Sequence, residues 1–466
     1  MDRDSSSDTN TAIFKAQIQA LIGEISRLST SPDPVETPEQ LDALEQQIHA
    51  LTRQLADHVT ALKIQQSIDG ETWQDKSHQL IKSQPKKQRN VGKRRVNVRF
   101  FGGTRLRIEV SYYTQKSTQK KGRGWYPSLI LLGIHDRCTP TLASEVSLLS
   151  SALCSFKEAQ HLLETRGCCL NIKTLRHITK RYAARARCAQ QRDEVPLSMP
   201  SIEGRRVVIS TDGGRVRIRR NKPGRKTKKG RRYLHTDWKE PKLMIIYLVN
   251  EEGRLEPTFS PFIDGTLSGP EAIFGLMKYY LTQLNITQAD KVMFVGDGAR
   301  WIWTRVKKLF SDLGLAVTKV VELLDFYHAM EHINALAKLK KSWSSQQKKT
   351  WTKKCRNLLL KGQLDTFLAQ IKLATKNAKG QLKTERNYFL RNQHRLDYLG
   401  TEQMQLPRGS GAIESAIRRV INLRLKGAGI YWLEDTASEM LLLRSYYKAG
   451  RWNLLKNMAN VVTVES

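Results

Sequence analysis

Two stretches of sequence, VVISTDGG at residues 207–214 and VMFVGDGA at residues 292–299, decide the fold that we predict for the second half of the chain. Each begins with an apolar run and continues into an aspartate beside glycine. Short apolar runs without polar alternation are typical of strands buried on both faces of a sheet. Similar runs and helical periodicity between them predict a mixed α/β sheet covered on both faces. The further strands are expected at 243–249 and 317–324, and the helices at 270–283 and 301–313.

The aspartates at these two strand ends are candidates for chemistry. Asp212 and Asp297 follow their strands at the edge where open α/β sheets bind ligands. An Asp-Gly pair after a strand is by itself most often a turn, but its occurrence twice in one predicted sheet favours a shared metal site. The neighbouring glycines would let a phosphate or a metal ion come close to the backbone.

A third carboxylate comes from Glu414, which follows the loop PRGSG (407–411) in the first turn of a predicted helix. Its simplest role there is to complement the helix dipole. Glu414, Arg418 and Asn422 are spaced by four residues and therefore share one face of that helix. Three carboxylates could instead hold two Mg²⁺ ions, with Mn²⁺ as an alternative, because hard oxygen ligands select these metals over Zn²⁺.

Other acidic residues compete for the same role. Asp264 and Asp325 also follow apolar runs. Asp325 and His328 lie one helical turn apart and could support the site or bind metal. A single histidine in such a position is more often a hydrogen-bonded structural residue.

The chain is strongly basic. Its 78 Lys and Arg residues against 44 Asp and Glu give a formal net charge of +34. The simplest partner for such a chain is a polyanion, above all nucleic acid. Basic blocks lie at 71–125, 215–232 and 331–400, so we predict a distributed surface for double-stranded DNA with strong salt dependence. The predicted DNA-binding side chains are Arg176, Lys180, Arg181, Arg217, Arg219, Arg220, Arg225, Lys226, Lys228, Lys229, Arg418, Arg419, Arg424 and Lys426.

The N-terminal region is expected to be helical. Apolar residues recur at helical spacing from Phe14 to Leu28 and in a heptad pattern from Leu41 to Leu62. The pattern suits a helical hairpin or a short coiled coil, and it is equally compatible with dimerisation and with packing inside the chain.

Three further features precede the predicted sheet. Residues 71–96 are polar and basic, which predicts a linker. Alternation around Gly102-Gly103 predicts a β hairpin. Helical periodicity at 140–187, with a turn at Gly167 and a basic last helix, predicts a helix-turn-helix-like DNA-binding domain, although an ordinary helical hairpin has the same spacing.

Composition excludes several classes of protein. The sequence has no long apolar run, and its first ten residues are polar and acidic, which excludes an obvious membrane span or secretory signal. Its six cysteines form no CxxC pair, which argues against a disulfide scaffold or a zinc ribbon. We therefore expect a cytoplasmic, nucleoid-associated protein without a membrane or small-molecule partner.

Five motifs follow one another along the second half of the chain: STDGG, GDGARWIW, LDFYHAMEH, GSGAIES and RLKGAG, the last followed by Trp432. Each motif alone is weak. In this order, within a match that covers about residues 95–455, they resemble the DDE transposases of bacterial insertion sequences, specifically the ISKra type, which is related to Mutator elements.

This resemblance implies a multi-domain chain of α+β and α/β class with a ribonuclease H-like catalytic domain. The family's catalytic, metal-binding acids fall on Asp212, Asp297 and Glu414, and His328 and Asp325 would support them. Together with the patterns described above, the resemblance gives these domains: a helical hairpin or coiled coil at 1–70, which lies outside the match, the linker at 71–96, the hairpin and helix-turn-helix-like region at 97–200, the first part of the catalytic core at 201–330, an all-helical basic insertion at 331–405 and the last part of the core at 406–466.

The resemblance also implies a function. A homo-oligomer, such as a dimer, would bind the terminal inverted repeats of its own element and use Mg²⁺ to cleave the DNA ends and to join them to target DNA. A structure-specific nuclease on the same fold, or a non-catalytic DNA-binding regulator derived from a transposase, are the alternatives. The tryptophans Trp301, Trp303 and Trp432 could stack on a distorted base, but core packing is the more common role.

Overall fold

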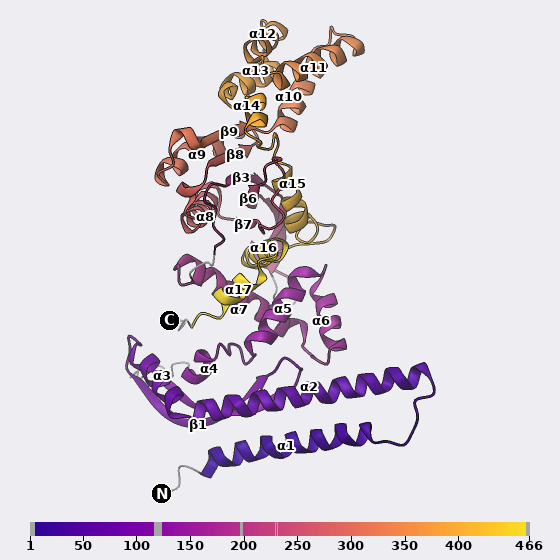
Figure 1. Cartoon of the computed structure of the whole chain (residues 1–466), viewed down its shortest axis with the longest axis vertical. Helices are drawn as coiled ribbons and strands as arrows, with labels where there is room; N and C mark the ends of the chain where they lie inside the picture. The colour runs from indigo at the N-terminus through magenta and orange to yellow at the C-terminus, as the bar shows by residue number, and fades with distance from the viewer. Residues whose placement is uncertain (1–4, 116–123, 196–198, 229, 231, 463–466) are drawn as a thin grey trace. The chain divides into compact units, whose positions relative to one another are not determined.

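The computed structural model separates into two compact units (Figure 1). Unit 1 comprises Met1–Val195 and Lys456–Ser466, and unit 2 comprises Pro196–Leu455. The chain has mixed α+β structure, and none of the helices in its described part is long and apolar enough to cross a membrane. The structure describes residues 5–115, 124–195, 199–228, 230 and 232–462.

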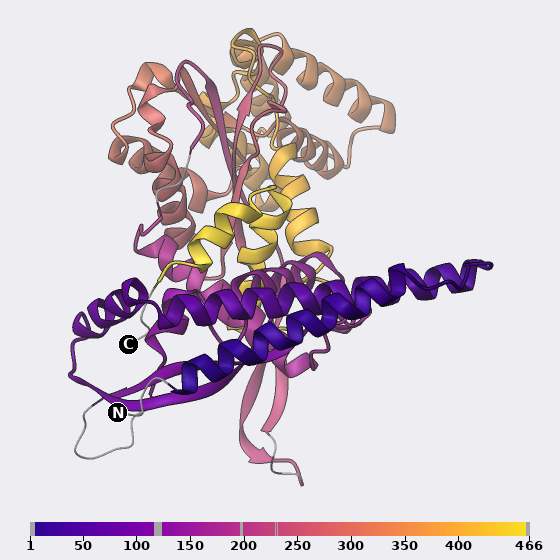
Figure 2. The ribbon, with the colours of Figure 1, turned by 60° about the horizontal axis from the view of Figure 1, so that its bottom comes forward.

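Unit 1 begins with a helical hairpin. Helices α1 (Ser5–Ser29) and α2 (Pro38–Asp69) pack against each other, as Figure 2 shows, and the predicted helical segments are confirmed. The predicted heptad is only partly used for packing within the chain. Its Leu51 is buried, whereas Leu41 and Ile48 are exposed.

The second feature of unit 1 is the β hairpin predicted around Gly102-Gly103. Strands β1 (Gln88–Arg99) and β2 (Arg105–Gln115) pair antiparallel. The segment expected to be a linker is instead helix α3 (Glu71–Lys82) and most of β1. Its basic composition hid the strand, because most of this part of β1 is exposed and held by backbone pairing to β2 rather than by burial of its side chains.

Helices complete unit 1, and those predicted within 140–187 are confirmed. Side-chain caps begin two of them: Ser155 accepts a hydrogen bond from the Glu158 N–H, and Asn171 accepts one from the Thr174 N–H. The helices are α4 (Pro127–Leu131), α5 (Pro140–Ala152), α6 (Phe156–Thr165) and α7 (Ile172–Gln191), and the short α17 (Trp452–Ala459) follows at the end of unit 2.

A five-stranded mixed sheet forms the centre of unit 2, in the order β7-β6-β3-β8-β9. β6 is antiparallel to both of its neighbours, β7 and β3, and β3, β8 and β9 run parallel. The four strands expected from apolar runs are confirmed, and β7 at the edge was not predicted. The bounds are β3 (Arg206–Gly213), β6 (Lys242–Val249), β7 (Phe262–Thr266), β8 (Lys291–Gly296) and β9 (Val320–Leu324).

Helices cover both faces of this sheet. Val207 and Ile209 of β3 share a core with helices α8 (Pro270–Gln283) and α9 (Arg300–Asp312). Helix α15 (Gly411–Ile417) packs against β3 and β6, and α16 (Glu434–Lys448) packs against β7. Alternate residues of each strand face opposite ways, so Val208 and Ser210 point away from the core that holds α8 and α9.

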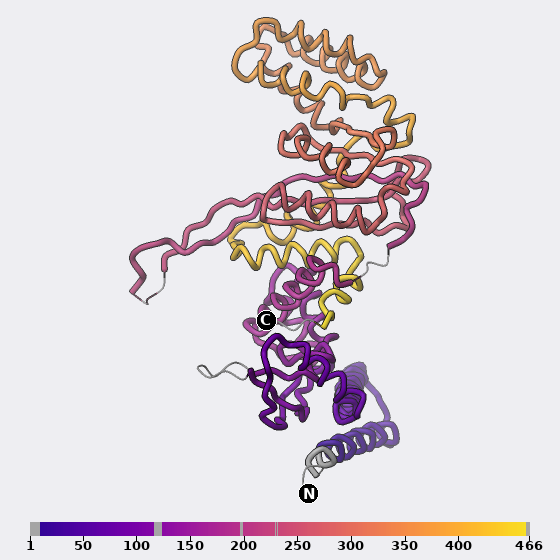
Figure 3. The backbone as a smooth tube through the Cα atoms, turned by 90° about the vertical axis from the view of Figure 1, so that its left-hand side faces the viewer, coloured from indigo at the N-terminus to yellow at the C-terminus, as the bar shows by residue number. Residues whose placement is uncertain are grey.

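Two further parts of unit 2 lie outside the sheet, one after β9 and one between β3 and β6. The predicted basic helical region is confirmed as helical: α10 (Phe326–Leu339), α11 (Ser345–Leu360), α12 (Leu364–Ala374), α13 (Gly380–Arg391) and α14 (Tyr398–Gln403). Between β3 and β6 the chain forms a two-stranded ribbon, β4 (Val216–Lys226) and β5 (Arg232–Lys239), which projects from the sheet in Figure 3.

Candidate active site

The two candidate aspartates lie beside each other because of the strand register. In the parallel pair β3–β8, Arg206 is opposite Lys291 and Ser210 is opposite Val295, a constant offset of 85 residues. Asp212 and Asp297 have the same offset, so the register carried two residues further places them opposite each other. Neighbouring strands are about 4.8 Å apart, which brings the two carboxylates into one site.

Helix α15 brings Glu414 to the same face of the sheet. Asp212 continues the alternation of Val208 and Ser210, and this is the face on which α15 packs. Glu414 lies in the first turn of α15 with its side chain exposed. The third candidate carboxylate therefore comes from a segment more than 110 residues beyond Asp297, and its ligand atoms lie close to those of Asp325 and His328.

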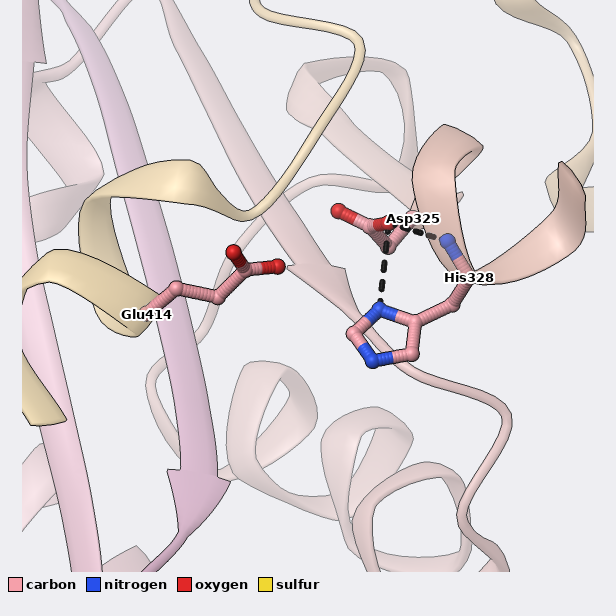
Figure 4. Close-up of side chains that lie close together, drawn as sticks. All are labelled: Asp325, His328 and Glu414. Atoms are coloured by element: carbon pink, nitrogen blue, oxygen red, sulfur yellow. Dashed lines mark hydrogen bonds and ion pairs between the residues drawn. The ribbon is translucent and has the colours of Figure 1, made fainter. Parts of the chain in front are cut away.

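Asp325 connects the parts of the site. Its side chain is fully buried and caps α10: Oδ1 accepts hydrogen bonds from the His328 backbone N–H at 2.7 Å and from His328 Nδ1 at 3.1 Å. Its Oδ2 accepts a hydrogen bond from the N–H of Ser410, in the loop just before α15. The ligand atoms of Asp325, His328 and Glu414 lie within 4.8 Å of one another, and Figure 4 shows the Glu414 carboxylate facing the other two.

These contacts set the charges of Asp325 and His328. Burial raises the pKa of Asp325, but the hydrogen bonds from His328 and Ser410 outweigh burial and lower that pKa to about 2. The hydrogen bond to Asp325 raises the pKa of His328 to about 9 against the effect of burial, and the charges of Asp325 and Asp297 raise it further. His328 is therefore an imidazolium at neutral pH, held among carboxylates.

The pKa of Asp212 is shifted in the opposite direction to that of Asp325. Burial raises its pKa to about 6, and the negative charge of Asp297 contributes to the rise, whereas a hydrogen bond from Gly213 and the charge of His328 oppose it. A raised pKa means that this site disfavours a second negative charge unless a cation is added. Perturbation of this kind is typical of functional sites.

The donor types suit a divalent metal ion, although the group of ligand atoms within 4.8 Å of one another consists of Asp325, His328 and Glu414 and does not include Asp212 or Asp297. Within the described residues, no Lys or Arg forms an ion pair with Asp212, Asp297 or Glu414, and His328, which pairs with Asp325, is the cation whose charge acts on Asp212. All three offer carboxylate oxygens, the donors that Mg²⁺ and Mn²⁺ prefer. Asp325 does not fit as a ligand, because it is fully buried and both its oxygens already accept hydrogen bonds. It is a positioning residue.

The glycines beside the aspartates have a different role from the one expected. A Cβ atom on Gly213 would overlap the Glu240 carboxylate, and one on Gly298 would overlap the ring of Tyr388. A Cβ on Gly214 would lie 2.7 Å from Cδ1 of Ile421. The space that we assigned to a phosphate or a metal ion is thus taken by protein side chains, which pack directly on the strand ends.

Sequence reasoning missed two residues that hold Asp297 in place. The Trp303 Nε1–H donates to the Asp297 carbonyl oxygen at 2.6 Å, while the Asp297 carboxylate accepts from the Ala299 N–H at 2.9 Å. Tyr388 of α13 packs on Gly298 and stacks on His332 with ring centroids 3.6 Å apart. The sequence signal for this packing was His332, the ring on which Tyr388 stacks. His332 follows His328 by four residues and therefore lies on the same side of α10.

The basic run 215–232 is the ribbon β4–β5. Only its base is buried, through Val216 and Ile218, and the rest of β4 is exposed or half-buried. Arg220 pairs with Glu434 at 3.2 Å, and Arg217 stacks on Tyr431. Four of the predicted DNA contacts form no ion pair among the described residues: Arg219, Arg225, Lys226 and Lys228. Lys229 lies outside the described residues.

The predicted contacts on α7 fall on a partly neutralised helix. Arg176 is exposed and stacks on Phe156, and Lys180 is also exposed. Arg181 lies 3.8 Å from Asp136. The face of α7 that packs against Asp136 is therefore a structural ion-pair site.

The predicted contacts after Glu414 need two corrections. The helix changes to a π-helical turn at Arg418–Asn422, so the spacing of four no longer keeps Glu414 and Asn422 on one face. Arg424 is buried with its guanidinium over the Trp432 ring, and it is not offered to DNA. Arg418 and Lys426 are exposed, and Arg419 is half-buried.

Hydrogen bonds from the indole N–H hold two of the three candidate tryptophans in the core. Trp432 and Trp303 are buried, and each donates its indole N–H to a backbone carbonyl oxygen. Core packing is thus their role in this structure. Asp264 is fully buried as well and accepts a hydrogen bond from Tyr280.

The chain matches no family model, no curated protein and no solved structure.

Proposed function

We propose that this chain is a Mg²⁺-dependent DNA transposase of the DDE type, which binds the terminal inverted repeats of an insertion sequence and carries out strand cleavage and strand transfer. The observation that carries this proposal is the strand register, whose constant offset of 85 residues, carried two residues further, aligns Asp212 with Asp297. The ordered motifs that resemble the ISKra-type transposases supply the choice of reaction.

We also propose that unit 2 has a ribonuclease H-like fold. In chain order its strands have the arrangement third, second, first, fourth, fifth, with the second strand antiparallel to the first and the last two parallel to it. This mixed five-stranded sheet with helices on both faces supports the proposal. The helices between Asp325 and Ser410 support the expected insertion before the last carboxylate.

In the proposed reaction, Asp212, Asp297 and Glu414 hold two Mg²⁺ ions. The chemistry that such ions supply is activation of the attacking oxygen and stabilisation of the leaving one. Asp325 holds the Glu414 loop and the imidazolium of His328 in place. His328 offers positive charge and a hydrogen-bond donor beside the site, where a phosphodiester would bind.

The proposed partner is double-stranded DNA, both at the ends of the element and at the target. Support comes from the net charge of +34 and from the exposed ribbon β4–β5, whose cations greatly outnumber its acids. A two-stranded ribbon has the width to enter the major groove of B-DNA. We further propose a homo-oligomer, such as a dimer, in the nucleoid-containing cytoplasm, with the exposed heptad residues Leu41 and Ile48 of α2 as support for self-association.

The test replaces one carboxylate at a time. We expect Asp297→Asn to abolish Mg²⁺-dependent nicking and joining of DNA that carries the sequences flanking the gene, while DNA binding is kept. The matched control is Asp290→Asn, the same change at the other end of β8, which should leave both reactions intact.

Three results separate the alternatives. Nicking and joining by Asp297→Asn at the wild-type rate would show that the metal-site assignment is wrong. Nicking without joining by the wild-type protein would indicate a nuclease. Binding without either reaction would indicate a regulator that has lost catalysis.

A further inference from the structure

A second site lies beside Asp297, and the residues proposed for metal binding do not include it. It is a pocket of about 180 Å³ between the beginning of α9 and the end of α13. Its walls come from both segments: Arg300, Trp303 and Thr304 from α9, and Arg391, Asn392 and Arg395 from α13 and the turn after it. Gly298, the residue after Asp297, also lines it.

The three arginines of this pocket have different roles. Arg395 is buried, pairs with Glu322 at 2.7 Å, donates to Asn392 Oδ1 at 3.1 Å and lies over the Trp303 ring at 4.1 Å. Its guanidinium is therefore part of the wall. Arg300 and Arg391 are exposed, and neither has an ion pair among the described residues.

The pKa of His394, next to Arg395, is lowered. Burial lowers the pKa of His394, and the positive charges of Arg395 and Lys307 lower it further, against the opposing charge of Glu322. Three arginines line the pocket, and among the described residues only Arg395 of these pairs with an acid. An anion would be favoured there.

Size and shape indicate which anion fits. Ligand pockets for drug-sized molecules usually measure about 300–1,000 Å³, so a pocket of about 180 Å³ is too small for a whole nucleotide. The Trp303 ring offers no stacking surface to a base on the side that Arg395 covers. Arginine forks match the paired oxygens of a phosphate group.

We propose that this pocket binds a phosphodiester group of DNA, held by the guanidinium groups of Arg300 and Arg391. The inference rests on the proposed function, in which the same DNA strand enters the carboxylate site. The pocket shares the loop of Asp297 through Gly298 and through the hydrogen bond from Trp303 to the Asp297 carbonyl. A phosphate held here would fix the strand relative to the scissile bond and would link the helical insertion to the sheet.

The experiment measures how DNA binding depends on salt. The full-length protein, its Arg391→Gln variant and the double variant Arg300→Gln/Arg391→Gln are titrated with a blunt 30-base-pair duplex between about 50 and 200 mM KCl. Each lost phosphate contact should reduce the slope of log K against log salt by about 0.9 for B-DNA. We expect the single variant to lose about one such step and the double variant up to two.

The matched control is Arg254→Gln, which removes the same charge. Arg254 is exposed, pairs only with the exposed Glu252 and follows β6, at the end of the sheet opposite to Asp212. It should leave the slope unchanged. Equal slopes for wild type and both pocket variants, or an equal loss in Arg254→Gln, would overturn the proposal.

Failure of this inference differs from failure of the proposed function. If the pocket variants lose the expected slope but the wild type neither nicks nor joins DNA in Mg²⁺, the pocket assignment stands and the transposase proposal fails. If the wild type nicks and joins DNA while the pocket variants keep the wild-type slope, the pocket assignment fails alone. If the wild type does not bind the duplex, both fail.

Discussion

Two Asp-Gly pairs in the sheet of unit 2 have similar sequences and opposite surroundings. Asp212-Gly213 ends β3, and Asp264-Gly265 lies in β7, two strands away across β6. Met244 of β6 is opposite Asp264 on one side and opposite Thr211 on the other. Asp264 is therefore aligned with the residue before Asp212, and this offset of one residue turns the two carboxylates to opposite faces of the sheet.

The two faces give the carboxylates different partners. Asp264 points towards α8, where it accepts hydrogen bonds from Tyr280 at 2.9 Å and from the Gly265 N–H at 2.7 Å, and Tyr280 in turn contacts the Tyr446 hydroxyl at 2.6 Å. Asp212 points towards α15 and has the neighbouring charges of Asp297 and His328. Both carboxylates accept a hydrogen bond from the N–H of the following glycine, but only Asp264 also accepts one from a side chain in the core, and a carboxylate with a perturbed pKa is typical of a functional site.

The largest effect expected from this contrast is on catalysis. We expect Asp212→Asn to slow Mg²⁺-dependent nicking by more than about 100-fold, because loss of even an outer partner of a metal ligand costs about 10–100-fold. The same variant should not lose stability at pH 7.5, since burial disfavours the negative charge of Asp212. Single-turnover nicking and urea unfolding measure the two effects. A variant that loses stability and keeps nicking would reverse the roles given to the two aspartates.

Asp264→Asn should behave in the opposite way. We expect it to lower the free energy of unfolding by about 1–3 kcal/mol, because a buried hydrogen-bond network loses its charged acceptor. Nicking per folded molecule should be unchanged. Tyr280→Phe, which removes only the hydroxyl donor, is the milder variant and should give a smaller loss in the same unfolding measurement. Unchanged stability in both variants would contradict the structural role of Asp264.

Stabilisation by a bound metal ion should also distinguish Asp212 from Asp264. At a concentration ten times its dissociation constant, a divalent ion should stabilise the wild-type protein by about 1.4 kcal/mol, and EDTA should remove this gain. Asp264→Asn should keep the shift, and Asp212→Asn should lose most of it. The measurement is the melting temperature in MnCl₂ and MgCl₂ titrations. An equal shift in Asp212→Asn would show that the ion binds elsewhere.

The smallest effect is the pH dependence of the Asp325–His328 pair. The pKa of His328 rises from 6.5 to about 9 on folding, so its contribution to stability is complete below pH 6.5 and is lost as the pH rises through 9. The pKa of Asp325 falls to about 2, so its contribution is lost only when the pH falls from about 4 to about 2. The stability difference between wild type and His328→Gln should therefore shrink between pH 6.5 and 9. A constant difference across this range would contradict the ion pair.

Much of the fold could be predicted from local sequence. The apolar runs of β3, β6, β8 and β9 have no polar alternation, and the helices between them have clear periodicity, so both were found. The strands that were missed are exposed or at an edge. β4 and the first part of β1 are rich in Lys and Arg and are held by pairing to another strand, which composition does not reveal.

The candidate site could be predicted only in part, for a related reason. Local sequence indicates Asp212 and Asp297, because each follows an apolar run. It also indicates Glu414, which follows a loop at the start of a predicted helix. Tyr388 has no such signal, since its contact with Gly298 joins segments 90 residues apart. The π-helical turn was also missed, because it is stabilised by Arg444 of α16, which donates to the carbonyl oxygens of Arg419 and Val420.

Sequence alone determined which residues end the buried strands and which way each side chain alternates, because the two-residue period of a strand is a property of its own backbone. It also contained the equal spacing of 85 residues that the register of β3 and β8 turned into proximity. Tertiary structure decided that Asp264 accepts a hydrogen bond from Tyr280 whereas Asp212 accepts one from its neighbour Gly213, that the buried Asp325 holds His328 and Ser410, and that the Tyr388 ring occupies the space that a Cβ atom on Gly298 would take. These outcomes depend on which distant side chains pack on each strand end, and no local pattern encodes that choice.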